Sequence, residues 1–343
     1  ISSGLVGSEM CIRDRVISLV KANIVLAVLL TNTILLIWFE RKVVAGMQSR
    51  VGPDRAGPFG ILQTLADAIK LLLKEQILPS KADRAMYLLA PLIALVPSFL
   101  IFMIIPLGPD ITVEWQNALY TIPLVGADLN VGVLYFLALS SIAVYSVVLA
   151  GWSSGSKYPL LGGVRASAQM ISYEAAMGLA LVPVILYSGS LSLVDIVNSQ
   201  AGNLSTSIPI LNSIVSFIPK WNIFPQFVAF GIFFIAAVAE VNRAPFDLVE
   251  AEQELVGGFH TEYSGFRFAM FFLAEYINMF NMCAITATFF LGGWLGPTFE
   301  GILPPIFSVI MPIIWLGVKT FLLLFVFVWI RATLPRLRYD QLM

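Results

Sequence analysis

The sequence predicts an all-α polytopic membrane protein, and three observations support this fold class. First, 58% of the 343 residues are hydrophobic and 12% are charged, whereas soluble domains are about 45–50% apolar. Second, residues 87–107 and 131–152 contain no Asp, Glu, Lys or Arg, and a helix of about 20 residues crosses a hydrocarbon core of about 30 Å. Third, these stretches do not alternate with a period of two. Helices, rather than the strands of a closed barrel, are therefore expected to satisfy the backbone in lipid.

Apolar runs of this kind define seven predicted transmembrane helices. They cover residues 16–39, 87–107, 131–152, 167–187, 221–239, 266–291 and 306–330. Lys and Arg test this arrangement, because cytoplasmic loops carry an excess of both. Fifteen Lys and Arg residues fall on one side of the membrane, whereas the opposite loops, 108–130, 188–220 and 292–305, hold only Lys220. The N-terminus is therefore expected outside, with residues 240–262 on the cytoplasmic side.

Residues 59–77 have the pattern of an amphipathic helix rather than a span. The polar face carries Gln63, Asp67, Lys70 and Lys74. The apolar face carries Ile61, Leu62, Leu65, Ile69 and Leu72. Such a helix lies in the membrane interface with its apolar face towards lipid, and its simplest role is that of a surface anchor with solvated charges. Residues 50–59, which precede it, are rich in Gly and Pro and predict a stiff turn.

The N-terminal residues differ in composition from the rest of the chain. Residues 1–15 have neither the long apolar core nor the small-residue cleavage site of a signal peptide, and we expect them to be a non-native leader. Residues 16–343 are expected to form a single helical transmembrane domain.

Potential metal ligands are scarce. Cys11 and Cys283 are the only cysteines and His260 is the only histidine, too few for an iron–sulfur cluster, a bis-histidine haem or a structural zinc site. We therefore expect no metal and no cofactor bound by this chain, so redox chemistry would need a cofactor held elsewhere. The chain has no Gly-rich phosphate loop or dinucleotide fingerprint, and no nucleic-acid partner is expected.

Three charged residues, Glu174, Glu275 and Lys319, fall inside predicted spans. A charge at the centre of a bilayer costs about 2.5–3.5 kcal/mol even on the more lenient insertion scale. These residues are therefore expected to face a polar interior and to mark a proton relay, an ion path or a buried pair. A Glu–Lys pair that joins two helices is the structural alternative.

Six carboxylates crowd into one short stretch of this weakly charged chain. They are Glu240, Asp247, Glu250, Glu252, Glu254 and Glu262. A helix here would place Asp247, Glu250 and Glu254 on one face. A solvated acidic loop is the alternative, although apolar residues such as Phe246 and Phe259 are interleaved with the carboxylates.

Arg243 is the only Lys or Arg between Glu240 and Glu262. Carboxylates with so few counter-charges cannot all ionise, so some of their pKa values are expected to rise and their protons to be shared. The sequence thus predicts a shared-proton state rather than a row of salt bridges.

Several long motifs occur in a characteristic order. They are ERK at residues 40–42, QSRVGPDRAGP at 48–58, ADAIK at 66–70, AEVNRAPFD at 239–247, EQELVGGFHTEY at 252–263 and AEY at 274–276. Together they resemble the H subunit of bacterial NADH:quinone oxidoreductase, the membrane-arm quinone-site component of respiratory complex I. GWSSGSKYPLLGG at 151–163 and RATLPRLRYDQLM at 331–343 are similar to the bacterial form and to its C-terminal signature. Members usually continue into one more membrane helix, giving eight, so we expect that this chain lacks the family's last helix.

The resemblance implies a place and a set of partners. Members of the family attach the membrane arm of complex I to its peripheral arm, within the bacterial inner membrane, and form the membrane end of the quinone chamber. Quinone would be the substrate. Soluble partner subunits would complete the quinone site and carry the iron–sulfur clusters, FMN and NADH, and other membrane-arm subunits would pump protons. The chain would belong to an enzyme without being catalytic alone.

The resemblance also implies two groups of site residues. The residues that would line or shape the quinone chamber are Arg41, Arg50, Asp67, Arg243, Phe246, Phe272 and Arg331. The residues that would form an acidic proton path are Glu174, Glu240, Asp247, Glu250, Glu252, Glu254 and Glu275. The amphipathic helix would border the entrance through which quinone leaves the bilayer, and loop 240–265 would be the moving element.

Two other functions remain open. A homologous subunit of a membrane-bound hydrogenase or formate hydrogenlyase would share the fold without handling quinone. A stand-alone ion or proton transporter would be expected to show an internal repeat or paired broken helices, and the sequence shows neither.

Overall fold

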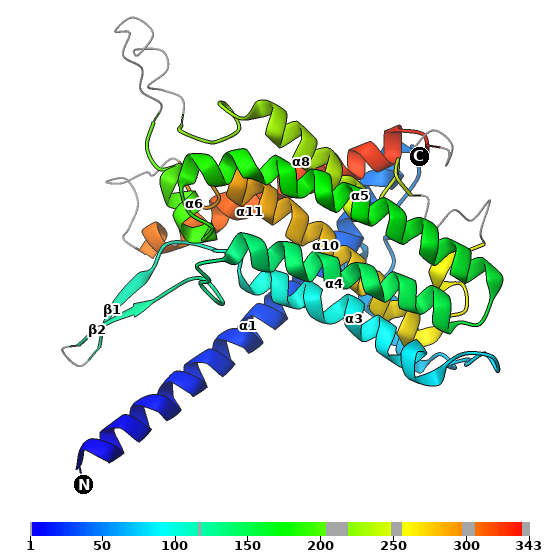
Figure 1. Cartoon of the computed structure of the whole chain (residues 1–343), viewed down its shortest axis with the longest axis horizontal. Coiled ribbons are helices and arrows are strands. Elements are labelled where there is room, and N and C mark those ends of the chain that lie inside the picture. Colours follow the sequence, from blue (N-terminus) through cyan, green and yellow to red (C-terminus); the bar gives the residue numbers. More distant parts are fainter. Residues whose placement is uncertain (1, 116–117, 204–218, 248–255, 297–305, 338–343) are drawn as a thin grey trace, which may run out of the picture.

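The structure, a computed structural model, describes residues 2–115, 118–203, 219–247, 256–296 and 306–337 (Figure 1). The side chains of residues 2–19, 112–122 and 306–309 are not part of this description. The long helices are α1 (Ser2–Met47), α3 (Arg84–Met103), α4 (Gly132–Ser153), α5 (Lys157–Ser188), α10 (Gly265–Phe290) and α11 (Ile306–Thr333). The shorter elements are η1 (Pro58–Gly60), α2 (Gln63–Leu73), β1 (Ile111–Trp115), β2 (Ala118–Ile122), α6 (Leu193–Ser199), α8 (Phe227–Glu240) and η2 (Gly258–His260).

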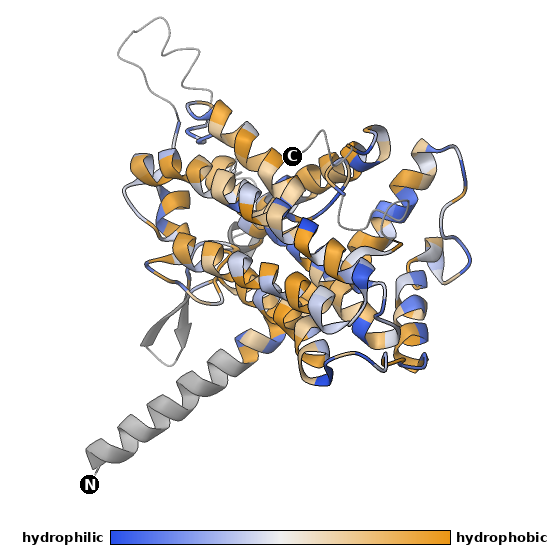
Figure 2. Ribbon diagram, turned by 45° about the vertical axis from the view of Figure 1, so that its right-hand side comes forward, coloured by the Kyte–Doolittle hydropathy of each residue, from blue (hydrophilic) through white to orange (hydrophobic). Residues whose placement is uncertain are grey.

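Helix α10 lies at the centre of the bundle. Helices α3, α4, α5 and α8 pack side by side in chain order, and α10 packs against α3, α8, α11 and α1 (Figure 1). The sequence accounts for this position, because a helix that is apolar on all sides is stable only when it is surrounded. Residues 281–290 of α10 are accordingly all buried. The hydropathy pattern shows apolar residues along the long helices and polar residues in the loops at their ends (Figure 2).

Six helices of the described chain are long and apolar enough to cross a membrane, so six of the seven predicted spans are confirmed as long helices. The fifth predicted span, 221–239, differs. Its helix, α8, begins only at Phe227 and has 14 residues, which is shorter than the roughly 20 residues of a complete span. Residues 221–226 form turns instead. They are held by the end of α10, where Asn222 Nδ2 donates to Phe289 O at 2.8 Å and Ile223 N donates to Phe290 O at 2.9 Å.

A β-hairpin interrupts the otherwise helical fold and was not predicted. Strands β1 and β2 pair antiparallel, with Ile111 opposite Ile122 and Trp115 opposite Ala118. The strands contain β-branched and aromatic residues that favour this conformation, in a loop that lies between two predicted spans.

The predicted amphipathic helix is confirmed as α2, although it is shorter than residues 59–77. Its apolar face is open, since Leu65, Ile69 and Leu72 are 44%, 49% and 56% exposed. This is the face that an interfacial helix offers to lipid. The proposed boundary of a non-native leader at residue 15 stays a prediction, and α1 is continuous from Ser2 to Met47.

Candidate functional site

Arg243 is the centre of a buried ionic cluster at one end of the bundle. The turn that follows α8 carries it inward, where its side chain is 6% exposed. Its Nη1 atom lies 3.4 Å from Glu40 Oε1 and its Nε atom lies 2.8 Å from Glu275 Oε1. The guanidinium carbon also lies 4.5 Å from the centre of the Tyr276 ring. Arg243 therefore joins α1, the turn after α8 and α10 through charge and a cation–π contact.

Two further arginines reach this region from the C-terminal segment. Arg331, near the end of α11, forms an ion pair with Glu40. Arg336 lies 3.7 Å from Asp247. The expectation that the acidic stretch has no counter-charge besides Arg243 is thus wrong for Asp247. The local sequence did not show the counter-charge, because that charge comes from 89 positions further along the chain.

Glu240 lies deeper than this cluster. It is the last residue of α8, it is 6% exposed, and its Oε2 atom is buried without a hydrogen-bond partner among the described residues. Burial of a carboxyl group without a cation disfavours its charged form. Among the described members of the predicted proton path, Glu240 is therefore the one whose surroundings most favour holding a proton.

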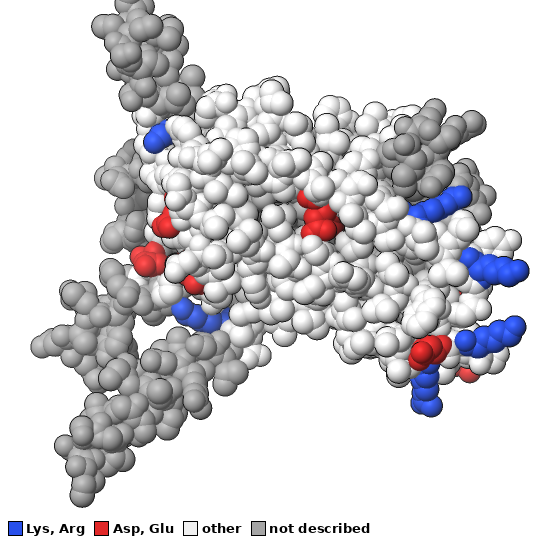
Figure 3. All heavy atoms as spheres, viewed as in Figure 1, with Lys and Arg blue, Asp and Glu red and all other residues white. Residues whose placement is uncertain are grey.

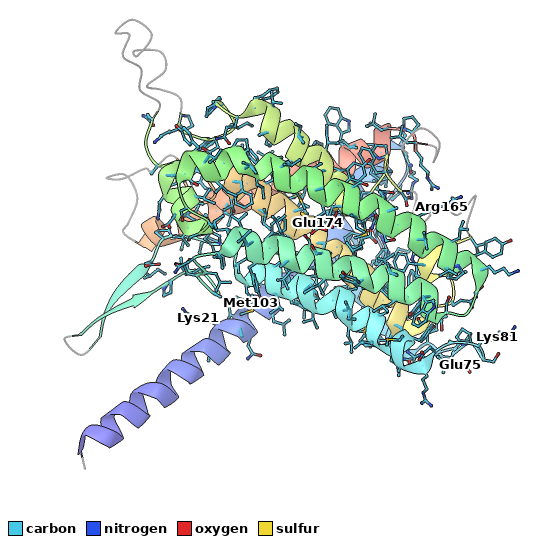
Figure 4. The ribbon with its side chains drawn as sticks, in the orientation of Figure 1. Lys21, Glu75, Lys81, Met103, Arg165 and Glu174 are labelled. Atoms are coloured by element: carbon cyan, nitrogen blue, oxygen red, sulfur yellow. The ribbon has the colours of Figure 1, made fainter. Side chains whose placement is uncertain are left out.

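Glu174 lies on α5, beyond Glu240, and is bound by hydroxyl groups. Ser140 Oγ lies 3.1 Å from Glu174 Oε1, and Ser141 Oγ donates to the same oxygen. Figure 4 places Glu174 midway along α5. In the same orientation, Figure 3 shows an acidic patch at that place, surrounded by uncharged atoms. Glu174 thus lies at the side of the bundle, midway along α5.

Two small cavities meet at Glu240. The larger, about 70 Å³, is lined by Glu240, Glu275, Asn278, Phe272 and His260 among others. The smaller, about 20 Å³, is lined by Glu240, Asn278 and Ser140 together with apolar residues. A cavity of about 10–15 Å³ on this measure holds one water molecule. Both cavities are therefore large enough for water, and Glu240 faces both.

The remaining predicted quinone residues form two further groups. Arg41 Nη1 lies 2.6 Å from Asp67 Oδ2, which ties α1 to α2. Burial raises the pKa of Asp67, but the hydrogen bond from Arg41 and the charge of that guanidinium outweigh burial and lower the pKa overall. Arg50 stands apart and donates to Gln48 at 2.7 Å.

Phe246 and Phe272 flank the acidic cluster with aromatic surface. The Phe246 ring lies 5.5 Å from the Tyr173 ring, and the Phe272 ring lies 4.8 Å from the Tyr276 ring. The structure thus brings Arg243, Arg331 and Phe272 together with the carboxylates. Glu250, Glu252 and Glu254, and the helix expected to align them with Asp247, lie outside the described residues.

Lys319, the third charge inside a predicted span, faces polar groups as expected, but these are backbone carbonyls and not the acidic residues of the site. Its ammonium donates to the carbonyl oxygens of Leu291 at 2.6 Å and Gly293 at 2.9 Å, and also to that of Leu295. It lies 4.3 Å from the Trp221 ring. A cation at the C-terminal end of a helix is stabilised by the unpaired carbonyls there. Lys319 therefore fixes the turn that follows α10, and it forms no ion pair with a Glu among the described residues.

The described end of the acidic loop, residues 256–264, is packed on the bundle. The Tyr263 and Tyr87 rings stack with their centres 4.1 Å apart, and Tyr87 Oη donates to Glu262 O at 2.8 Å. Gly258 has φ +62° and lies so close to α5 that a Cβ on Gly162 would be 2.9 Å from its Cα atom. Burial lowers the pKa of the nearby His260 to about 4.

Some residues of the site were not singled out from the sequence. Glu40, Ser140, Ser141 and Asn278 are all part of it. Glu40 could have been found, because it is a carboxylate at the end of an apolar run. The serines carry no signal that separates them from other serines inside spans.

Comparison with known proteins places the chain in a family. The NADH dehydrogenase family matches residues 20–343. A protein of Koribacter versatilis, named as an H subunit of NADH-quinone oxidoreductase, is 48% identical over 335 residues, which cover 95% of this chain and 90% of the relative. One of the same name from Syntrophobacter fumaroxidans is 50% identical over 94% of this chain and 88% of its own length. The H subunit of Frankia alni is 51% identical over 95% of this chain and 67% of its own. The match over residues 20–343 and these relatives show that the chain belongs to the NADH dehydrogenase family.

Proposed function

We propose that this chain is the membrane-embedded H subunit of a proton-translocating NADH:quinone oxidoreductase, which forms the membrane side of the quinone chamber and couples quinone reduction to proton translocation. The names and identities of the relatives support the enzyme over a hydrogenase component or a stand-alone transporter. The chain is one part of that enzyme. NADH, FMN and iron–sulfur clusters belong to soluble partner subunits, and other membrane subunits complete the membrane arm.

The chemistry of the ionic cluster supports its place beside quinone. A quinone headgroup gains two electrons and takes up two protons, so cations beside it stabilise the negative charge that develops. Arg243 and Arg331 supply such cations, and Phe246 and Phe272 supply aromatic surface. Arg41, Asp67 and Arg50 belong to the same chamber in this proposal, and the exposed apolar face of α2 borders the entrance for an isoprenoid tail.

One observation carries the coupling proposal: Glu240 faces two cavities that lead to different carboxylates. The larger cavity also contacts Glu275, which is bound to Arg243 in the ionic cluster. The smaller cavity also contacts Ser140, which lies within hydrogen-bond distance of Glu174. A change of charge beside Arg243 would thus reach Glu174 through Glu275 and Glu240. Asp247, Glu250, Glu252 and Glu254 would supply the cytoplasmic end of this path.

The half-buried position of Glu174 at the side of the bundle supports a path that continues into a neighbouring subunit. A carboxylate that faces hydrocarbon costs several kcal/mol, about 2.5–3.5 on the lenient scale. Another membrane subunit would therefore cover this face. The basic ends of the helices near Lys81 and Arg165 (Figures 3 and 4) support an orientation with the ionic cluster on the cytoplasmic side of a bacterial inner membrane.

The test is Glu240→Gln in the assembled complex, in membrane vesicles. We expect NADH:quinone reductase activity to persist while proton pumping falls, because the amide cannot release a proton. Glu75→Gln is the matched control, since Glu75 is exposed and lines neither cavity. Unchanged pumping with Glu240→Gln would contradict the proposed path.

A further inference from the structure

Ser140 lies between Glu240 and Glu174. It lies in the middle of α4 and is 3% exposed. Its Oγ atom is 3.1 Å from Glu174 Oε1, and Ser140 is one of the residues that line the smaller cavity beside Glu240. Ser141 also contacts Glu174 but does not line that cavity. The two adjacent serines therefore share one carboxylate and differ in their access to the other.

Each serine hydroxyl has two acceptors and a single proton. Ser140 Oγ is within 2.9 Å of Leu137 O as well as 3.1 Å from Glu174 Oε1, and Ser141 Oγ is 3.0 Å from Leu137 O. A hydroxyl donates one hydrogen bond at a time. When Glu174 is ionised, donation to the carboxylate is favoured because charge-assisted bonds are stronger. When Glu174 is protonated, its own hydroxyl can donate to a serine, and that serine can turn to Leu137 O.

The smaller cavity supplies the rest of the connection. Its volume of about 20 Å³ fits one water molecule, which needs two to four polar partners. Glu240, Asn278 and Ser140 are the polar residues of its lining. A water molecule there would stand between the Glu240 carboxyl group and the Ser140 hydroxyl.

We propose that Ser140 is the relay residue through which a proton passes between Glu240 and Glu174, and that Ser141 is a positioning residue that holds Glu174. This inference rests on the proposed function. The Glu240 carboxyl group gives its proton to the water, the water gives another to Ser140 Oγ, and the original hydroxyl proton of Ser140 passes to Glu174 Oε1. Glu240 loses one proton and Glu174 gains one, while water and serine are unchanged. Once Glu174 has passed its proton on, rotation of the new Ser140 hydroxyl from the cavity side to Glu174, with Leu137 O as the alternative acceptor, resets the relay.

The experiment measures protons pumped per NADH oxidised in vesicles that contain the assembled complex. Ser140→Ala removes one oxygen, and we expect pumping to fall by about a hundredfold or more, within the range for loss of a proton-transfer group, while quinone reduction continues. Ser140→Thr keeps the hydroxyl, and the variant is expected to keep at least about half of the pumping. That loss is far smaller than the loss of a proton-transfer group causes. Ser98→Ala is the matched control, because the Ser98 hydroxyl is buried, donates to Ala94 O at 2.9 Å and contacts neither carboxylate.

Ser141→Ala separates the two serines, and its effect is expected to be clearly smaller than that of Ser140→Ala. Normal pumping with Ser140→Ala would overturn the inference. An equal loss with both alanine variants would also overturn it, because contact with Glu174, and not access to the cavity, would then be what matters. If Glu240→Gln abolishes pumping and Ser140→Ala does not, the proposed function stands and only the relay fails. If Glu240→Gln pumps normally, the proposed function fails as well.

Discussion

Glu40, near the end of α1, and Arg331, near the end of α11, form an ion pair between residues 291 positions apart in the sequence. The same Glu40 oxygen also accepts a hydrogen bond from Arg243. Two arginines thus meet on one buried carboxylate, and Arg243 reaches on to Glu275. This contact therefore joins α1 and α11, the first and last described helices of the bundle, beside the ionic cluster.

Arg243→Ala is expected to destabilise the site and to lower quinone reduction. Removal of the shared cation leaves Glu40 and Glu275 with less compensation, and breaking a buried ion pair costs about 3–5 kcal/mol. The melting temperature of the purified complex and its NADH:quinone reductase rate measure the two effects. Arg84→Ala, at an exposed arginine, is the control, and equal behaviour of the two variants would contradict the role given to Arg243.

Gly162→Ala is expected to displace residues 256–264 from α5. The new Cβ would be 2.9 Å from Gly258 Cα and 3.0 Å from Phe259 N, and overpacking of this kind costs about 1–3 kcal/mol. Thermal unfolding and proteolysis of the loop would report the loss. Gly178→Ala on the same helix is the control, since its nearest neighbour would be 3.9 Å away, and there alanine is expected to be neutral or stabilising.

The stability of the folded chain is expected to depend on pH through His260. Burial lowers its pKa from 6.5 to about 4, so the unfolded chain binds a proton more readily than the folded one. Its contribution is fully present above pH 6.5 and is lost as the pH falls towards 4, by about 3 kcal/mol in total. Melting temperatures between pH 7.5 and pH 4.5 should fall less for His260→Phe than for the unchanged chain. Parallel curves would show that His260 does not titrate in this way.

Lys319→Met is expected to affect stability and not coupling. The variant leaves three carbonyls at the end of α10 without their cationic donor, and each hydrogen bond to a charged group is worth about 1.5–3 kcal/mol. The melting temperature should fall, while the complexes that remain assembled should pump normally. A selective loss of pumping would instead place Lys319 in the proton path.

The sequence predicted what depends on long apolar runs and on local pattern. Six spans and the amphipathic α2 followed from these alone. The error at residues 221–226 has a tertiary cause: Asn222 Nδ2 and Ile223 N donate to carbonyls at the end of α10 and keep the chain in turns.

The site was predicted less completely because its partners are far apart in the sequence. A count of charges around Arg243 missed Arg336, which neutralises Asp247 from the C-terminal segment. The intramembrane position of Lys319 was clear, but the carbonyls that bind it belong to the end of another helix. Ser140 and Ser141 contact Glu174 only because α4 packs against α5, and the sequence alone does not show this packing.

The most direct test of the account is the number of protons pumped per NADH oxidised by the complex that carries Glu240→Gln, with Glu75→Gln measured in parallel. We predict that the complex with Glu240→Gln keeps quinone reduction and pumps less than about a tenth as many protons, in line with the loss of a proton-transfer group. Glu75→Gln should pump like the unchanged complex. Equal pumping by the two variants would contradict a proton path through Glu240.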